Sequence, residues 1–150
     1  MYARAIDERR GLVVWYPSRP NPADWEAHLR DVAQINGWSK RLGFRPAVLL
    51  LADEFDRPDA KMRQRLAQIT GERSYDPYIA FVNANAVLRG VLTMLSWMHP
   101  RPSYDLTYSP DESAGIAWLE QRRGERLPEL RLLSIEARGQ VRKASLRKDE

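Results

Sequence analysis

The distribution of apolar and polar positions divides the chain into short strands and longer helices. A short strand is expected at 2–7, a second is predicted at 12–17 by its β-branched and aromatic residues, and the few residues between them predict an antiparallel hairpin. Two continuous apolar runs, 46–52 and 78–84, are typical of strands that are covered on both faces. A fifth, short strand is predicted at 103–109.

Apolar residues at helical spacing occupy the segments between and after these strands. They predict helices over the following ranges: about 23–42, 59–69, 85–98, 109–123 and a short one at 128–137. A hairpin followed by alternating helices and strands indicates an α/β protein with a mixed sheet on which the helices pack. The chain is therefore expected to form a single domain over residues 1–137.

The predicted helix Ala86–Met98 is apolar around much of its circumference. One row of apolar side chains contains Val87, Val91, Met94 and Met98, and a second row contains Leu88, Leu92 and Leu95. A helix that is apolar all round is either deeply buried or covered by a partner. A homodimer formed through Ala86–Met98 is one interpretation, and ordinary core packing is the other.

Composition limits the class of protein. With 150 residues, 43% hydrophobic and 29% charged, the chain suits one globular domain. No apolar run is long enough to span a bilayer, and the first residues lack the apolar core of a signal peptide, so we expect a cytoplasmic protein without membrane insertion. The absence of cysteine excludes disulfides, thiol nucleophiles and thiolate metal sites.

The net charge of +4 is modest, and acidic residues accompany the basic ones along most of the chain. The clearest basic excess is in residues 138–150, which are expected to form a flexible tail. Such a tail can follow phosphates, but the charge distribution does not favour nucleic-acid binding.

The common catalytic signatures are absent from the sequence. It contains no P-loop, no dinucleotide-binding glycine motif and no Gly-x-Ser-x-Gly turn. Its two histidines are far apart in the chain: His28 lies within the first helix and is expected at the boundary of the core rather than as a base, and His99 is expected at the end of the third helix. We therefore expect no enzymatic activity, no zinc site and no cofactor.

Four carboxylates follow the strand at 46–52 and form the first candidate site: Asp53, Glu54, Asp56 and Asp59. Oxygens from this loop can hold a hard cation, but the spacing differs from the Asp-x-Asp motif of aspartyl phosphoryl-transfer enzymes. Helix initiation is the alternative, with Asp56 as the cap, Pro58 in the first turn and Asp59 three residues after the cap. This interpretation leaves Asp53 and Glu54 unexplained.

A second candidate site lies at the next junction between a strand and a helix. Asn83, Asn85 and Arg89, together with free backbone N–H groups at a helix start, can contact an anion or a partner. Asn85 also has the position and the side chain of a simple N-cap.

The order of elements and several motifs resemble the STAS domains, the fold of bacterial anti-sigma-factor antagonists, and in particular their divergent SpoIIAA-like members. The similarity covers about residues 2–122 and rests on the hairpin and on three segments, "PAVLLLAD", "YIAFVNANAVLRGVLTML" and "YSPDESAGIAWLEQ". The resemblance implies a mixed sheet of four or five strands with helices mostly on one face. It also implies a regulatory, non-enzymatic role in protein–protein interaction.

In the antagonist members of that family a regulatory serine lies just after the third strand. Here no Ser or Thr occurs between Ser39 and Thr70, and the carboxylates of Asp53–Asp59 occupy that loop. The leading hypothesis is a regulatory module without the switch serine, which docks an unidentified protein partner through this loop or through Ala86–Met98. The alternatives are a domain that binds a small apolar ligand or lipid and, third, a metal-dependent phosphoryl enzyme.

Overall fold

Five strands form one mixed β-sheet in the computed structural model, which describes residues 1–149. They are β1 (Tyr2–Asp7), β2 (Leu12–Pro17), β3 (Ala47–Leu51), β4 (Tyr78–Val82) and β5 (Asp105–Ser109). The strands lie side by side in sequence order, with β1 antiparallel to β2 and all later neighbours parallel. The predicted hairpin and the α/β fold class are confirmed.

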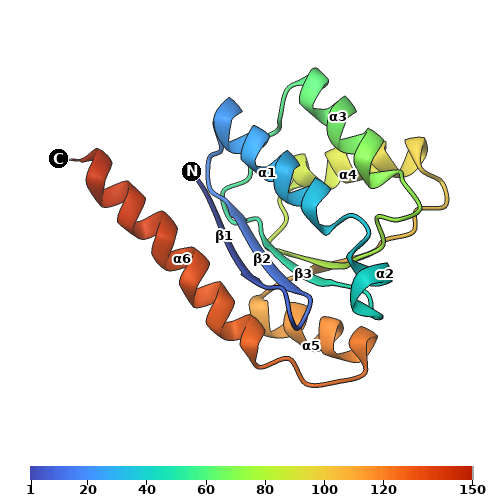
Figure 1. The fold of residues 1–150 in the computed structure, drawn as a ribbon. Helices are drawn as coiled ribbons and strands as arrows, with labels where there is room; N and C mark the ends of the chain where they lie inside the picture. The colour runs from blue at the N-terminus through green and yellow to red at the C-terminus, as the bar shows by residue number, and fades with distance from the viewer. Residues whose placement is uncertain (150) are drawn as a thin grey trace.

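Helices cover both faces of the sheet (Figure 1). They are α1 (Pro22–Ile35), α2 (Trp38–Leu42), α3 (Ala60–Thr70), α4 (Ala86–Met98), α5 (Glu112–Arg123) and α6 (Glu129–Lys148). Most of them, α1 to α4, lie on one side of the sheet, while α5 and α6 pack on the other. Within residues 1–149, no helix combines the length and the apolar character needed to cross a membrane.

The side chains of the central strands alternate between two buried layers. Val13 and Leu50 belong to the layer beneath α1, α3 and α4. Leu12, Leu49 and Leu51 belong to the layer beneath α5 and α6. Every residue of β3 is buried, which explains its continuous apolar sequence.

Three element boundaries differ from the predictions. The first helix is interrupted at Gly37, which has a φ of +81°, so it forms α1 and α2. Asp59, and not Asp56, caps α3 by accepting a hydrogen bond from the backbone N–H of Met62. An N-cap at Asp56 requires a helical Arg57, but a residue before proline disfavours that conformation. The helix predicted from residue 109 also begins later, because Asp111 caps α5.

The C-terminal segment also differs from the prediction, because a single 20-residue helix replaces both the short helix and the tail expected from residue 138. The second half of α6 lies against the sheet, where Val141 is buried. Gln140 donates a hydrogen bond to the backbone oxygen of Arg4. The domain boundary expected at 137 therefore has no counterpart in the structure.

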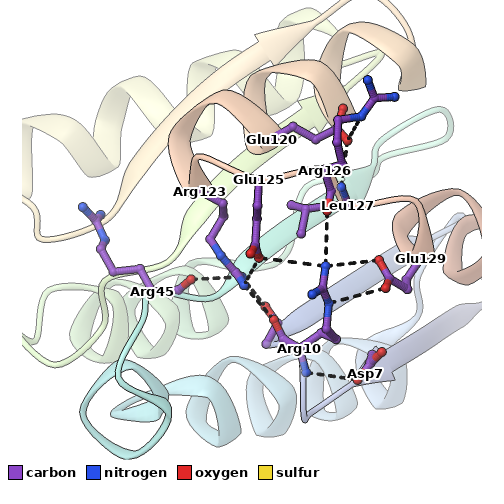
Figure 2. A network of polar contacts seen from close by, with 10 residues as sticks. Asp7, Arg10, Arg45, Glu120, Arg123, Glu125, Arg126, Leu127 and Glu129 are labelled. Carbon is purple, nitrogen blue, oxygen red and sulfur yellow. Dashed lines mark hydrogen bonds and ion pairs between the residues drawn. The ribbon is translucent and has the colours of Figure 1, made fainter.

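Arg123, at the end of α5, anchors that helix to the amino-terminal end of the parallel strands (Figure 2). Its guanidinium donates hydrogen bonds to the backbone oxygens of Arg10 at 2.9 Å, Arg45 at 3.3 Å and Gly11 at 3.4 Å. It also contacts Glu125 at 2.9 Å, and only 5% of its side chain is exposed. One buried cation thus satisfies carbonyl groups from two separate turns of the chain.

We expect Arg123→Met to lower the free energy of unfolding by about 3 kcal/mol, because it leaves the carbonyl groups of Arg10 and Arg45 without the donor that Arg123 supplies. Arg126→Met is the matched control: this side chain is 93% exposed and pairs only with Glu120, so the expected loss is below about 1 kcal/mol. Urea denaturation followed by circular dichroism measures both values. Equal losses in the two variants would show that the Arg123 network adds nothing specific.

Candidate functional site

A cavity of about 90 Å³ lies between the sheet and the helices α1, α3 and α4. Its wall consists almost entirely of apolar and aromatic groups. It is formed by Trp15, Trp25, His28, Val32, Leu50, Phe55, Pro58, Leu66, Thr70, Tyr75, Ile79, Phe81, Leu88, Val91, Leu92, Leu95, Tyr104 and Leu106. One water needs roughly 10–15 Å³ of such space, so the cavity has room for a small organic molecule.

Helix α4 forms one side of this cavity. Its inner residues Leu88, Leu92 and Leu95 line the space, and Leu92 and Leu95 are only half-buried. The backbones of α3 and α4 make few close approaches to the strands, whereas α5 and α6 lie directly on the sheet. The cavity lies where α3 and α4 stand away from the strands that they cover.

Both ends of α4 are attached to neighbouring segments. At its start, the side chain of Asn85 accepts a hydrogen bond from the N–H of Leu88 at 2.9 Å and donates one to the backbone oxygen of Phe55 at 3.2 Å. At its end, Nε2 of His99 donates to the backbone oxygen of Ala67 in α3 at 2.6 Å. These contacts confirm Asn85 as an N-cap and hold the helix over the cavity.

His28 is the one imidazole on the cavity wall, and it is buried rather than at a boundary. The rings of Trp15, Tyr2 and Trp25 surround it edge-on, with centroids 4.8, 5.5 and 5.7 Å from that of His28. Burial among these rings lowers the pKa of His28 to about 4. The imidazole is therefore neutral at pH 7.

A short polar chain fixes which nitrogen of His28 carries the proton. Asp31 is ion-paired with Arg4 and accepts a hydrogen bond from the Tyr2 hydroxyl at 2.6 Å. Burial, together with the charge of Asp31, raises the pKa of Tyr2, so this hydroxyl stays protonated. Because its only proton points to Asp31, the Tyr2 oxygen accepts from Nδ1 of His28 at 3.3 Å. Nε2 of His28 is then an unprotonated acceptor.

The acidic loop is largely occupied by contacts within the chain. Asp53 accepts hydrogen bonds from the Asn83 amide and from Arg138, both at 2.7 Å. Arg138 comes from α6 and also contacts Glu112 at the start of α5. The structure thus brings Asp53 and Asn83 into direct contact at the ends of two neighbouring parallel strands, and it adds an ion pair between Asp53 and Arg138, a residue that the sequence did not indicate.

The other carboxylates of this loop have different surroundings. Glu54 accepts a hydrogen bond from the Ser18 hydroxyl at 2.6 Å and contacts Arg19 at 3.4 Å. Asp59 caps α3, while Asp56 is exposed. Within residues 1–149 no group of three or more acidic or histidine side chains is placed to hold a metal ion.

The second candidate set, Asn83, Asn85 and Arg89, does not converge on one point. Asn83 bonds to Asp53, and Asn85 caps its helix. The guanidinium of Arg89 lies over the ring of Tyr108, 5.0 Å from its centroid, and its Nε donates to the backbone oxygen of Ala84. This arrangement leaves the three side chains engaged with separate neighbours.

Comparison of the chain with protein-family models, with curated proteins and with solved structures finds no match. The features of the molecule that bear on function are therefore the cavity and the surfaces around it.

The neutral state of His28 predicts a specific loss of stability in acid. The pKa of His28 is about 6.5 in the unfolded chain and about 4 in the folded protein. Between these two pH values the unfolded chain therefore binds a proton at His28 that the folded protein does not bind. The free energy of unfolding should therefore fall by about 3 kcal/mol more in the wild type than in His28→Leu between pH 7 and pH 4. Denaturant titrations of both proteins at several pH values measure this difference. The carboxylates are the same in both proteins, so their contribution to the pH dependence cancels. Parallel pH profiles would contradict a buried neutral imidazole.

Proposed function

We propose that the protein is a non-enzymatic binding module of STAS-like fold that takes a small apolar ligand into the cavity beneath α4. The observation that carries this proposal is the cavity itself, which is about 90 Å³ in volume and bounded by aromatic and aliphatic side chains. Well-packed interiors leave few spaces larger than a water molecule, so a cavity of this size is uncommon in a domain of 150 residues.

The character of the wall supports an uncharged ligand. Among residues 1–149, its ionisable members are His28, Tyr75 and Tyr104. Burial lowers the pKa of His28 and raises the pKa of both tyrosines, so all three are neutral at pH 7. A charged ligand would lose its hydration here and gain no counter-charge.

The contacts of the acidic loop favour ligand binding in the cavity over docking of a partner at Asp53–Asp59. A docking surface needs carboxylates that are free to meet a partner, whereas Asp53, Glu54 and Asp59 each have partners within the chain. Asp53 and Glu54, which capping did not explain, join the loop to Arg138, Ser18 and Arg19. Their contacts suit a structural role at the edge of the sheet.

The cavity predicts binding of toluene, used as a probe. At ten times the dissociation constant, toluene should stabilise the fold by about 1.4 kcal/mol and raise the melting temperature by about 3–6 °C. Leu92→Trp, which fills the cavity, should abolish this increase. Val87→Trp is the matched control, because Val87 lies on the exposed side of the same helix. No increase for the wild type, or the same increase for Leu92→Trp, would reject the proposal.

A second candidate function is regulatory docking through the outer face of α4, and one observation favours it. Four apolar residues of this helix are exposed, with Trp97 the most exposed at 76%; the others are Val87, Met94 and Met98. Aromatic residues and methionine are enriched at protein interfaces. A second copy of the chain is the occupant we propose, since the same face would meet itself in a symmetric dimer.

We expect the wild type to sediment as a dimer at micromolar concentrations and the double variant Met94→Lys, Trp97→Lys to sediment as a monomer. Leu146→Lys is the control, because Leu146 is an exposed apolar residue at the far end of α6. Analytical ultracentrifugation measures the three masses. A monomeric wild type would contradict the proposed dimer and would not affect the proposal of ligand binding.

A further inference from the structure

We infer that the ligand of the cavity is a neutral apolar molecule that carries one hydroxyl group and donates its proton to Nε2 of His28. This inference rests on the proposed ligand-binding function and specifies the chemical class of the ligand. It depends on one polar atom in an otherwise apolar wall.

The free acceptor follows from the contacts of His28. Its Nδ1 is used as a donor to the Tyr2 hydroxyl, whose proton is held by Asp31. Nε2 has no hydrogen-bond partner among residues 1–149, yet protein atoms do not seal it off. His28 lines the cavity, so a ligand there can approach its imidazole. A buried acceptor without a donor is unfavourable, and a ligand hydroxyl would remove that cost.

The other polar groups of the wall do not offer the same opportunity. The hydroxyl of Thr70 donates to the backbone oxygen of Leu66 at 2.9 Å, within α3. The indole N–H of Trp15 has no partner but is enclosed by protein atoms. The hydroxyls of Tyr75 and Tyr104 are donors as well as acceptors, so they do not select for a ligand that donates. His28 alone demands a donor.

The pair phenol and toluene tests this inference, because they have nearly the same shape and differ in one hydroxyl. A cavity without an acceptor should bind phenol about tenfold to a hundredfold more weakly than toluene, because the hydroxyl of phenol would be buried without a hydrogen-bond partner. With Nε2 of His28 available, phenol should bind at least as tightly as toluene. Isothermal titration calorimetry at pH 7 gives both dissociation constants.

Substitutions then assign the effect to His28. In His28→Leu, the affinity for phenol should fall at least tenfold relative to the affinity for toluene, while toluene still binds. Thr93→Val is the control, because it removes a hydroxyl from the exposed side of α4, away from the cavity wall, and should leave the ratio of the two constants unchanged. Phenol binding tenfold weaker than toluene in the wild type, or an unchanged ratio in His28→Leu, would overturn the inference.

A measurement on the unmodified protein covers the case in which His28→Leu fails to fold. The chain has two histidines, so ¹⁵N-histidine labelling gives few signals. Phenol should shift the unprotonated Nε2 signal of His28 upfield, and toluene should not. Equal responses to both probes would overturn the inference even if both bind. If neither probe binds, the proposed function itself fails; if toluene alone binds, only the inference about the hydroxyl fails.

Discussion

The burial of β2 and β3 on both faces is the constraint on which the rest of the structure depends. Their side chains alternate between two cores, so each face of the sheet requires its own layer of helices. On one face this layer is tight, with α5 and α6 directly against the strands. On the other face α3 and α4 stand away from the sheet, and the cavity lies beneath them. The ligand proposal is thus a consequence of unequal packing on two faces of one sheet.

The sequence predicted this sheet well because its signals are local. The continuous apolar run of β3 and the closely spaced strands of the hairpin indicate their own structure. Helix α6 was underestimated for an equally physical reason: its buried positions include Ser134 and Ala137, which are small and only weakly apolar. A helix that packs closely through small side chains lacks the apolar stripe on which such predictions rely.

The candidate site was harder to predict than the fold. A cavity depends on the distance between the helices and the sheet on which they pack, and the pattern of residues in the sequence does not give this distance. The sequence did identify α4 as too apolar for an ordinary surface helix, which was the available signal. The role of His28 depends on Tyr2 and Asp31, which join it only in three dimensions. Likewise, Asp53 drew attention as an unexplained acid, and its explanation is Arg138, which lies 85 residues further along the chain.

The attachment of α4 at its two ends has a mechanical consequence. Asn85 fixes one end to the loop that follows β3, and His99 fixes the other to α3, where Gly71 leaves room for the imidazole; a Cβ atom at Gly71 would collide with that ring. A helix held at both ends and loosely supported between them resists swinging outward as a lid. The size of ligand that can enter the cavity is then set by the rotamers of Leu92 and Leu95 on the middle turns of α4. The same few side chains therefore control both which ligand binds and how it enters.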